Sequence, residues 1–179
     1  MRAKILDTLH NRSKSVPERI EDVIKTFNHP VFENINLCSA DLKISQWIPV
    51  FESLERLDES WSRLLALLKE KHENADTKGF DAFMKNRETE YEQLLCYLIY
   101  RHFSNAEFVE DMAVCFAFSV LIYKLIYSLG AVIFTETGKF TVENQLELIR
   151  LFSSEIEYSD ENLDIILNKL DKELFGSCN

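Results

Sequence analysis

The polar group Tyr100-Arg101-His102 is the strongest candidate for chemistry in this sequence, and Tyr97 precedes it by one helical turn. A guanidinium in this position can bind a carboxylate or another anion through its planar fork of N–H donors. Cationic side chains near the end of a helix also stabilise the helix dipole, which is the structural alternative. We predict a binding site formed by Tyr97, Tyr100, Arg101 and His102, with no catalytic residue.

Aromatic residues are frequent around this group and could line a pocket for an adenine ring or a methylated amine. Aromatics at helical spacing more often belong to the core, so core packing is the favoured interpretation. The set consists of Tyr91, Tyr97, Tyr100, Phe108, Phe116, Phe118, Tyr123 and Tyr127.

The motifs of the common enzyme and metal sites are missing from the sequence. No two of the four histidines form an H-x-x-x-H or H-E-x-x-H pair, and no two of the four cysteines form a C-x-x-C pair. Four scattered glycines cannot build a phosphate-binding loop. We therefore expect no metal site. Glu155 and Glu157 are interpreted as solvated acidic surface.

The charge balance argues against nucleic acid as a partner. The net charge is −10, and no window supplies the basic footprint that phosphate binding requires. Cys96 and Cys115 lie in apolar runs, where thiols usually act as small buried hydrophobes, and no apolar leader opens the chain. A cytoplasmic location is the expectation.

Hydrophobic periodicity predicts an all-α fold, a bundle of about seven or eight helices around one or two apolar central helices. Capping residues indicate where helices begin, and they are Ser15 with Glu18, Asp58, Thr141, and Ser159. We expect one domain over residues 1–179, a loop over 28–40, and a long loop or sub-boundary near 72–79.

Two apolar segments in the second half carry specific expectations. Met112 to Phe134 is long enough to span a bilayer, but Lys124 near its middle favours a buried core helix over a membrane span. The helix capped by Thr141 is expected to bury an apolar stripe. Its members are Val142, Leu146, Ile149, Phe152 and Ile156.

Three stretches resemble the C-terminal helical region of the flagellin lysine-N-methylase family. They are residues 92–103 (EQLLCYLIYRHF), 138–153 (GKFTVENQLELIRLFS) and 155–163 (EIEYSDENL), with weaker similarity at 9–13 and 57–61. The similarity covers most of the chain. It lies in helix faces and caps, which are moderately specific.

The resemblance implies S-adenosylmethionine as methyl donor and flagellin lysines as acceptors. It also implies an N-terminal cysteine cluster that this sequence does not contain, so no catalytic residue carries over. The chain is then either part of a system whose catalytic half lies elsewhere, with flagellin or a catalytic methylase subunit as partner, or a relative that lost activity.

Two alternatives remain open at this point. The chain could be a complete small S-adenosylmethionine-dependent protein-lysine methyltransferase, with the cofactor held among the tyrosines. It could also be a membrane-attached helical interaction protein, although we expect no membrane partner. Self-association is compatible with all three hypotheses.

Overall fold

The computed structural model describes residues 1–27 and 42–176. These two ranges contain nine α-helices and no strand. The all-α prediction is therefore confirmed. The expected loop over 28–40 falls outside the described residues, as do Cys38, Cys178 and His29. The helices group into two compact units that interleave along the sequence.

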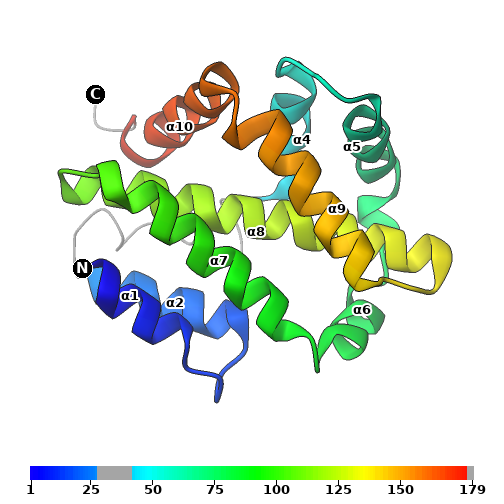
Figure 1. The fold of residues 1–179 in the computed structure, drawn as a ribbon, viewed down its shortest axis with the longest axis horizontal. Coiled ribbons are helices and arrows are strands. Elements are labelled where there is room, and N and C mark those ends of the chain that lie inside the picture. The colour runs from blue at the N-terminus through cyan, green and yellow to red at the C-terminus, as the bar shows by residue number, and fades with distance from the viewer. Residues whose placement is uncertain (28–41, 177–179) are drawn as a thin grey trace. The chain divides into compact units, whose positions relative to one another are not determined.

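Unit 1 comprises Met1–Leu42, Asn86–Tyr123 and Leu167–Asn179. In it, α1 (Arg2–Leu9) and α2 (Val16–Phe27) pack on each other and on α7 (Glu88–His102), as Figure 1 shows. The capping box predicted at Ser15 is present in part, because Glu18 accepts the Ser15 backbone N–H at 2.7 Å. The apolar face of α2 is buried at Ile20 and Val23.

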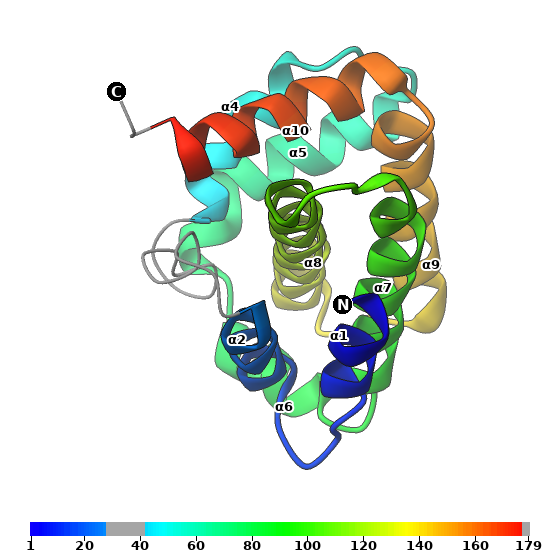
Figure 2. The same ribbon diagram turned by 90° about the vertical axis from the view of Figure 1, so that its left-hand side faces the viewer.

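Unit 2 comprises Lys43–Lys85 and Lys124–Ile166. It contains the neighbouring helices α4 (Ile44–Ser53) and α5 (Glu59–Lys71), visible in Figure 2, together with α6 (Thr77–Met84) and α9 (Val142–Phe152). Asp58 caps α5 as predicted, accepting the Ser60 N–H at 2.7 Å. The expected long loop at 72–79 is replaced by a 3-10 turn at His72–Asn74 and by the first turn of α6, which Asp76 caps.

The long apolar helix is α8 (Val109–Thr137), whose first part belongs to unit 1 and whose second part belongs to unit 2. By length and composition it could cross a bilayer, but 67% of its most apolar window is buried inside the structure. This is the burial expected of a core helix. Gly138 ends the helix with φ 70°, the left-handed conformation that glycine adopts without steric cost.

The buried face of α9 differs from the predicted stripe. The capping box at Thr141 with Asn144 is present, but Val142 and Leu146 are exposed. Phe152 and Ile156 are buried as predicted. Leu148 and Leu151 are buried as well, together with Gln145, whose two amide atoms have no hydrogen-bond partner among the described residues. The predicted stripe was therefore wrong at Val142 and Leu146 and right at Phe152 and Ile156.

Glu155 and Glu157 are buried, so their interpretation as solvated surface was also wrong. The reason is a π-helical turn over Ser153–Glu157, which follows α9 directly. Its wider turn changes the direction of successive side chains, and the consecutive residues Glu155, Ile156 and Glu157 all become buried.

Glu155 holds the segment between α4 and α5. Its carboxylate is 1% exposed and accepts the backbone N–H groups of Leu57 at 3.0 Å and Asp58 at 2.7 Å. Asn162, at the start of α10 (Asp160–Phe175), accepts the Glu55 N–H at 3.0 Å and donates to the Glu55 carbonyl at 2.9 Å. These bonds satisfy backbone groups in the segment between α4 and α5 that have no partners within a helix.

We predict that Glu155→Gln lowers the free energy of unfolding by about 2 kcal/mol, because one of the two accepting carboxylate oxygens is replaced by an NH2 group, which cannot accept a backbone N–H. Urea denaturation measures the loss. Hydrogen exchange should accelerate at the amides of Leu57 and Asp58. The exposed Glu70→Gln on α5 is the matched control, and an equal effect of the two changes would contradict this role of Glu155.

Candidate functional site

Helix α7 carries the four predicted site residues. Glu88 and Glu90 lie in its first turn and Arg101 and His102 in its last, which is the arrangement that favours a helix dipole. Its inward face is apolar, and the buried members are Tyr91, Leu94, Leu95, Leu98 and Ile99. This packing fixes which side chains of α7 point outward.

Three of the predicted site residues lie together on the outward face. Tyr97, Tyr100 and Arg101 are spaced i, i+3 and i+4, so they share one side of α7. Tyr97 is 42% exposed and Tyr100 is 64% exposed. The guanidinium of Arg2 in α1 lies over the Tyr100 ring, 4.9 Å from its centroid, within the range of a cation–π contact.

His102 is separated from these residues. Its ring meets the edge of buried Phe118 in α8, with the centroids 5.0 Å apart. The Cys115 thiol contacts the His102 carbonyl oxygen, with Sγ and O 3.6 Å apart. His102 therefore packs on the interior of unit 1, and the surface group consists of Tyr97, Tyr100 and Arg101.

The other aromatic residues that could have lined one pocket are dispersed. Phe116 and Phe118 are fully buried, and Tyr91 packs edge-on against Tyr123 at 5.6 Å in unit 1. Tyr127 packs against Phe80 in unit 2. The favoured core interpretation therefore describes the buried members, while Phe108 is exposed.

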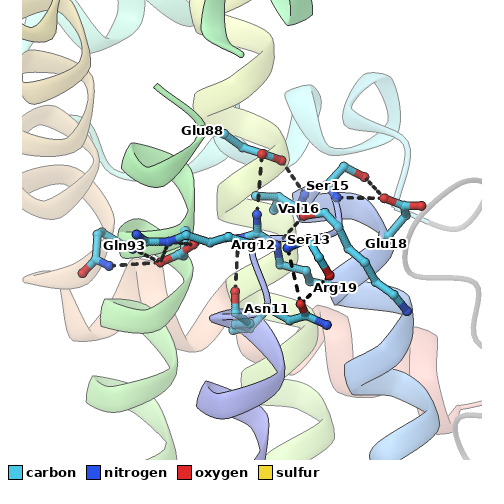
Figure 3. Close-up of polar contacts among 12 residues, drawn as sticks. Asn11, Arg12, Ser13, Ser15, Val16, Glu18, Arg19, Glu88 and Gln93 are labelled. Carbon is cyan, nitrogen blue, oxygen red and sulfur yellow. Dashed lines mark hydrogen bonds and ion pairs between the residues drawn. The ribbon is translucent and has the colours of Figure 1, made fainter. Parts of the chain in front are cut away.

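A buried ion cluster lies on the side of α7 that faces α1 and α2. Glu92 is 1% exposed, and it binds Arg19 of α2 at 2.7 Å and Arg12 of the α1–α2 connection at 2.8 Å. Arg12 Nε adds a second bond at 3.0 Å, which makes a bidentate pair of the kind that a guanidinium fork forms with a carboxylate. Figure 3 shows Arg12 and Arg19 converging here, with Gln93 beside them.

The remaining donors of this cluster are also used. Arg19 donates to the backbone carbonyls of Leu9 at 3.1 Å and Lys14 at 2.7 Å. Glu88 accepts the backbone N–H of Val16 at 2.6 Å and lies 3.5 Å from Arg19 (Figure 3). The cluster therefore joins the end of α1, the connection after it and the start of α2 to a single face of α7.

The contacts fix the register of α1 on α7. Arg2 lies over Tyr100, His10 Nε2 lies 3.5 Å from Cys96 Sγ, and Arg12 binds Glu92. Successive contacts from Arg2 to Arg12 meet residues of α7 with decreasing residue numbers, so the two helices are antiparallel. Arg2, His10 and the outward residues of α7 consequently form one continuous surface.

Electrostatics in this region favour charge on Glu92 and disfavour charge on the thiols. Hydrogen bonding and proximity to Arg12, followed by Arg19, lower the pKa of Glu92 against the opposing effect of burial. Burial, with the Glu92 charge nearby, raises the pKa of Cys96 to about 11. Burial and Asp111 raise the pKa of Cys115 to about 11. Neither thiol is a nucleophile at neutral pH, because the thiolate is the reactive form.

Within residues 1–27 and 42–176, no three His, Cys, Asp or Glu side chains converge in a way that could hold a metal ion. The surface of Tyr97, Tyr100 and Arg101 has hydrogen-bond donors, a cation and exposed aromatic area. These are the features of a binding surface.

The fold and this surface define an all-helical domain with an exposed aromatic and cationic helix face. The chain belongs to the FliB lysine N-methylase C-terminal domain family, whose model matches residues 2–178. This confirms the resemblance that the helix faces and caps indicated. No curated protein and no solved structure matches the chain.

Sequence reasoning missed the Glu92 cluster, although a signal for it was present. Glu92 shares a helix face with Leu95 and Ile99, which are both fully buried. An acidic residue in such an apolar stripe requires a cation or several hydrogen-bond donors as partners. The arginines in the first twenty residues were the available candidates.

We predict that Glu92→Gln lowers the free energy of unfolding by about 3 kcal/mol, because it removes the closer of the two carboxylates beside buried Arg19 and leaves only the more distant Glu88. The lowered pKa of Glu92 means that its contribution is complete above about pH 4.3, the ordinary unfolded value, and is lost as the pH falls through the folded-state pKa.

Urea denaturation at neutral and acidic pH measures this effect. The difference in free energy of unfolding between the parent chain and Glu92→Gln should become smaller as the pH falls. Glu90→Gln is the control on the same helix, since Glu90 pairs only with nearby Arg87 among the bonds described and such pairs contribute little. A difference in free energy of unfolding that stays constant or grows as the pH falls would contradict the role of the Glu92 charge.

We predict that Cys96 and Cys115 react with iodoacetamide roughly a hundredfold more slowly in the folded protein than in concentrated urea at a pH near 8, because burial keeps both thiols protonated. The rate should rise about tenfold per pH unit, since the thiolate fraction does. Mass spectrometry of the two peptides measures each thiol separately. Equal rates in folded and unfolded protein would contradict the raised pKa values.

Proposed function

We propose that this chain is a non-catalytic module of flagellin lysine methylation, which docks flagellin or a catalytic methylase subunit. The observation that carries the proposal is the family match over residues 2–178, combined with a surface suited to binding. Tyr97, Tyr100 and Arg101 provide that surface, and the Glu92 cluster holds it in place.

The side chains offer support for a binding role over a catalytic one. Both described thiols are held protonated, and no set of metal-ligating side chains converges among the described residues. Lysine methylation by S-adenosylmethionine needs a site that aligns the donor methyl with an unprotonated amine and excludes water. An exposed helix face does not provide such an enclosure.

The predicted residues were also tested for their fit to S-adenosylmethionine itself. A small cofactor is normally held in a concave site that covers most of its surface. Tyr97 and Tyr100 are exposed on one helix, and the Arg2 guanidinium already lies over the Tyr100 ring. These residues therefore do not fit the cofactor.

Calorimetric titration with S-adenosylmethionine tests the proposal. We expect no binding heat at millimolar cofactor, with circular dichroism confirming that the sample is helical. Copurification with flagellin or with a cysteine-cluster methylase subunit would support the docking role. Micromolar binding of the cofactor would contradict it and would favour a complete methyltransferase.

A further inference from the structure

A thiol and an imidazole from different parts of unit 1 meet where the end of α1 lies on α7. His10 Nε2 is 3.5 Å from Cys96 Sγ, and the two residues are 86 positions apart in sequence. His10 is exposed and Cys96 is partly exposed, so the contact lies at the surface. No three potential metal ligands converge within residues 1–27 and 42–176, but this pair supplies two donor atoms.

The separation of the two donor atoms suits a metal ion as well as a hydrogen bond. A tetrahedral zinc ion binds a thiolate sulfur at about 2.3 Å and an imidazole nitrogen at about 2.0 Å, which places these atoms about 3.5 Å apart. Without metal, the protonated thiol of Cys96 donates to Nε2 of the neutral His10 ring across the same distance. Both contacts use the Nε2 lone pair, so a metal ion can replace the thiol proton without moving α1 away from α7.

Contacts on both sides hold Cys96 against the end of α1. Glu92, Cys96 and Tyr100 are spaced i, i+4 and i+8 on α7, so they form one row that faces α1. At one end of this row Glu92 binds Arg12 at 2.8 Å, and at the other end the Arg2 guanidinium lies over the Tyr100 ring. Cys96 lies between these two contacts.

The backbone of His10 is also held on both sides. Its N–H donates to the Leu6 carbonyl oxygen at 3.0 Å, and its carbonyl oxygen accepts the Arg12 N–H at 2.9 Å. A pair of ligands that is positioned before binding avoids part of the ordering cost that binding otherwise imposes.

We propose that Cys96 and His10 bind a zinc ion that bridges the end of α1 to α7. Thiolate and imidazole favour zinc and similar ions, whereas magnesium and calcium prefer oxygen ligands. As the metal–sulfur bond forms, the thiol proton passes to the buffer and Nε2 donates its lone pair, with no transfer of electrons between oxidation states. Water completes the coordination, because Arg12 and Arg19 already bind the nearby Glu92 carboxylate. This inference is independent of the proposed docking role.

Cobalt(II) is the probe, because a cobalt–thiolate bond gives a charge-transfer band in the near ultraviolet and a cobalt–imidazole bond does not. The full chain is freed of metal with a chelator, kept reduced with a phosphine and titrated with Co2+ at about pH 8, where the released proton is taken up by the buffer. Zn2+ is then added as competitor. Circular dichroism melting confirms that each variant is folded and measures stabilisation by Zn2+.

We expect the charge-transfer band in the parent chain and its loss when Zn2+ is added. Cys96→Ser should abolish the band, and His10→Gln should weaken Co2+ binding about tenfold or more, because one of the two protein ligands is lost. Zn2+ should raise the melting temperature of the parent chain but not that of Cys96→Ser. Cys115→Ser and His72→Gln are the matched controls and should bind as the parent does, since each of these side chains contacts a backbone carbonyl oxygen.

Four outcomes would overturn the inference. The first is no charge-transfer band at millimolar Co2+. The second is a band that persists in Cys96→Ser, which would assign the metal to another thiol. The third is unchanged affinity in His10→Gln, which would reduce the site to a single cysteine. The fourth is an equal loss of binding in either control. None of these outcomes bears on copurification with flagellin or a methylase subunit, so the proposed function is tested separately.

Discussion

A buried carboxylate is stable only when hydrogen-bond donors or cations surround it, and Glu92 is the residue on which unit 1 depends in this way. It holds two arginines that are 80 and 73 residues away in sequence. Removing the carboxylate would leave Arg19 charged and buried, so the end of α1 and the start of α2 could not remain on α7 in the same arrangement. The cluster specifies a register that apolar contacts alone would leave less defined.

Unit 2 uses a related solution without an arginine. Glu155 accepts backbone N–H groups from the segment before α5, and these partners are 97 and 98 residues away. In both units a buried glutamate therefore ties an irregular segment to a distant helix. The segments differ in what they provide, since one donates guanidinium groups and the other donates backbone amides.

The exposed surface of α7 follows from this internal arrangement. Because Glu92 and the apolar residues face inward, the row that contains Tyr97 and Tyr100 faces outward. The same cluster sets where α1 lies, and so places Arg2 over Tyr100. The surface that we propose for binding thus depends on side chains that do not belong to it.

Helix existence and most helix starts could be predicted from the sequence because caps act locally. Asp58 and Thr141 accept the backbone N–H groups expected of them, and Glu18 accepts the backbone N–H of Ser15. The burial of Glu155 and Glu157 could not be predicted, since a π-helical turn shifts the periodicity on which such predictions rest. Three of the four proposed site residues share a surface, while His102 packs inward, as the spacing of a helix requires.

We propose that the chain binds a partner in lysine methylation and does not itself transfer the methyl group. The most direct measurement is the incorporation of labelled methyl from S-adenosylmethionine into purified flagellin lysines by this chain alone. We expect no incorporation above that of a sample without the chain. Multiple turnovers of lysine methylation by the chain alone would contradict it.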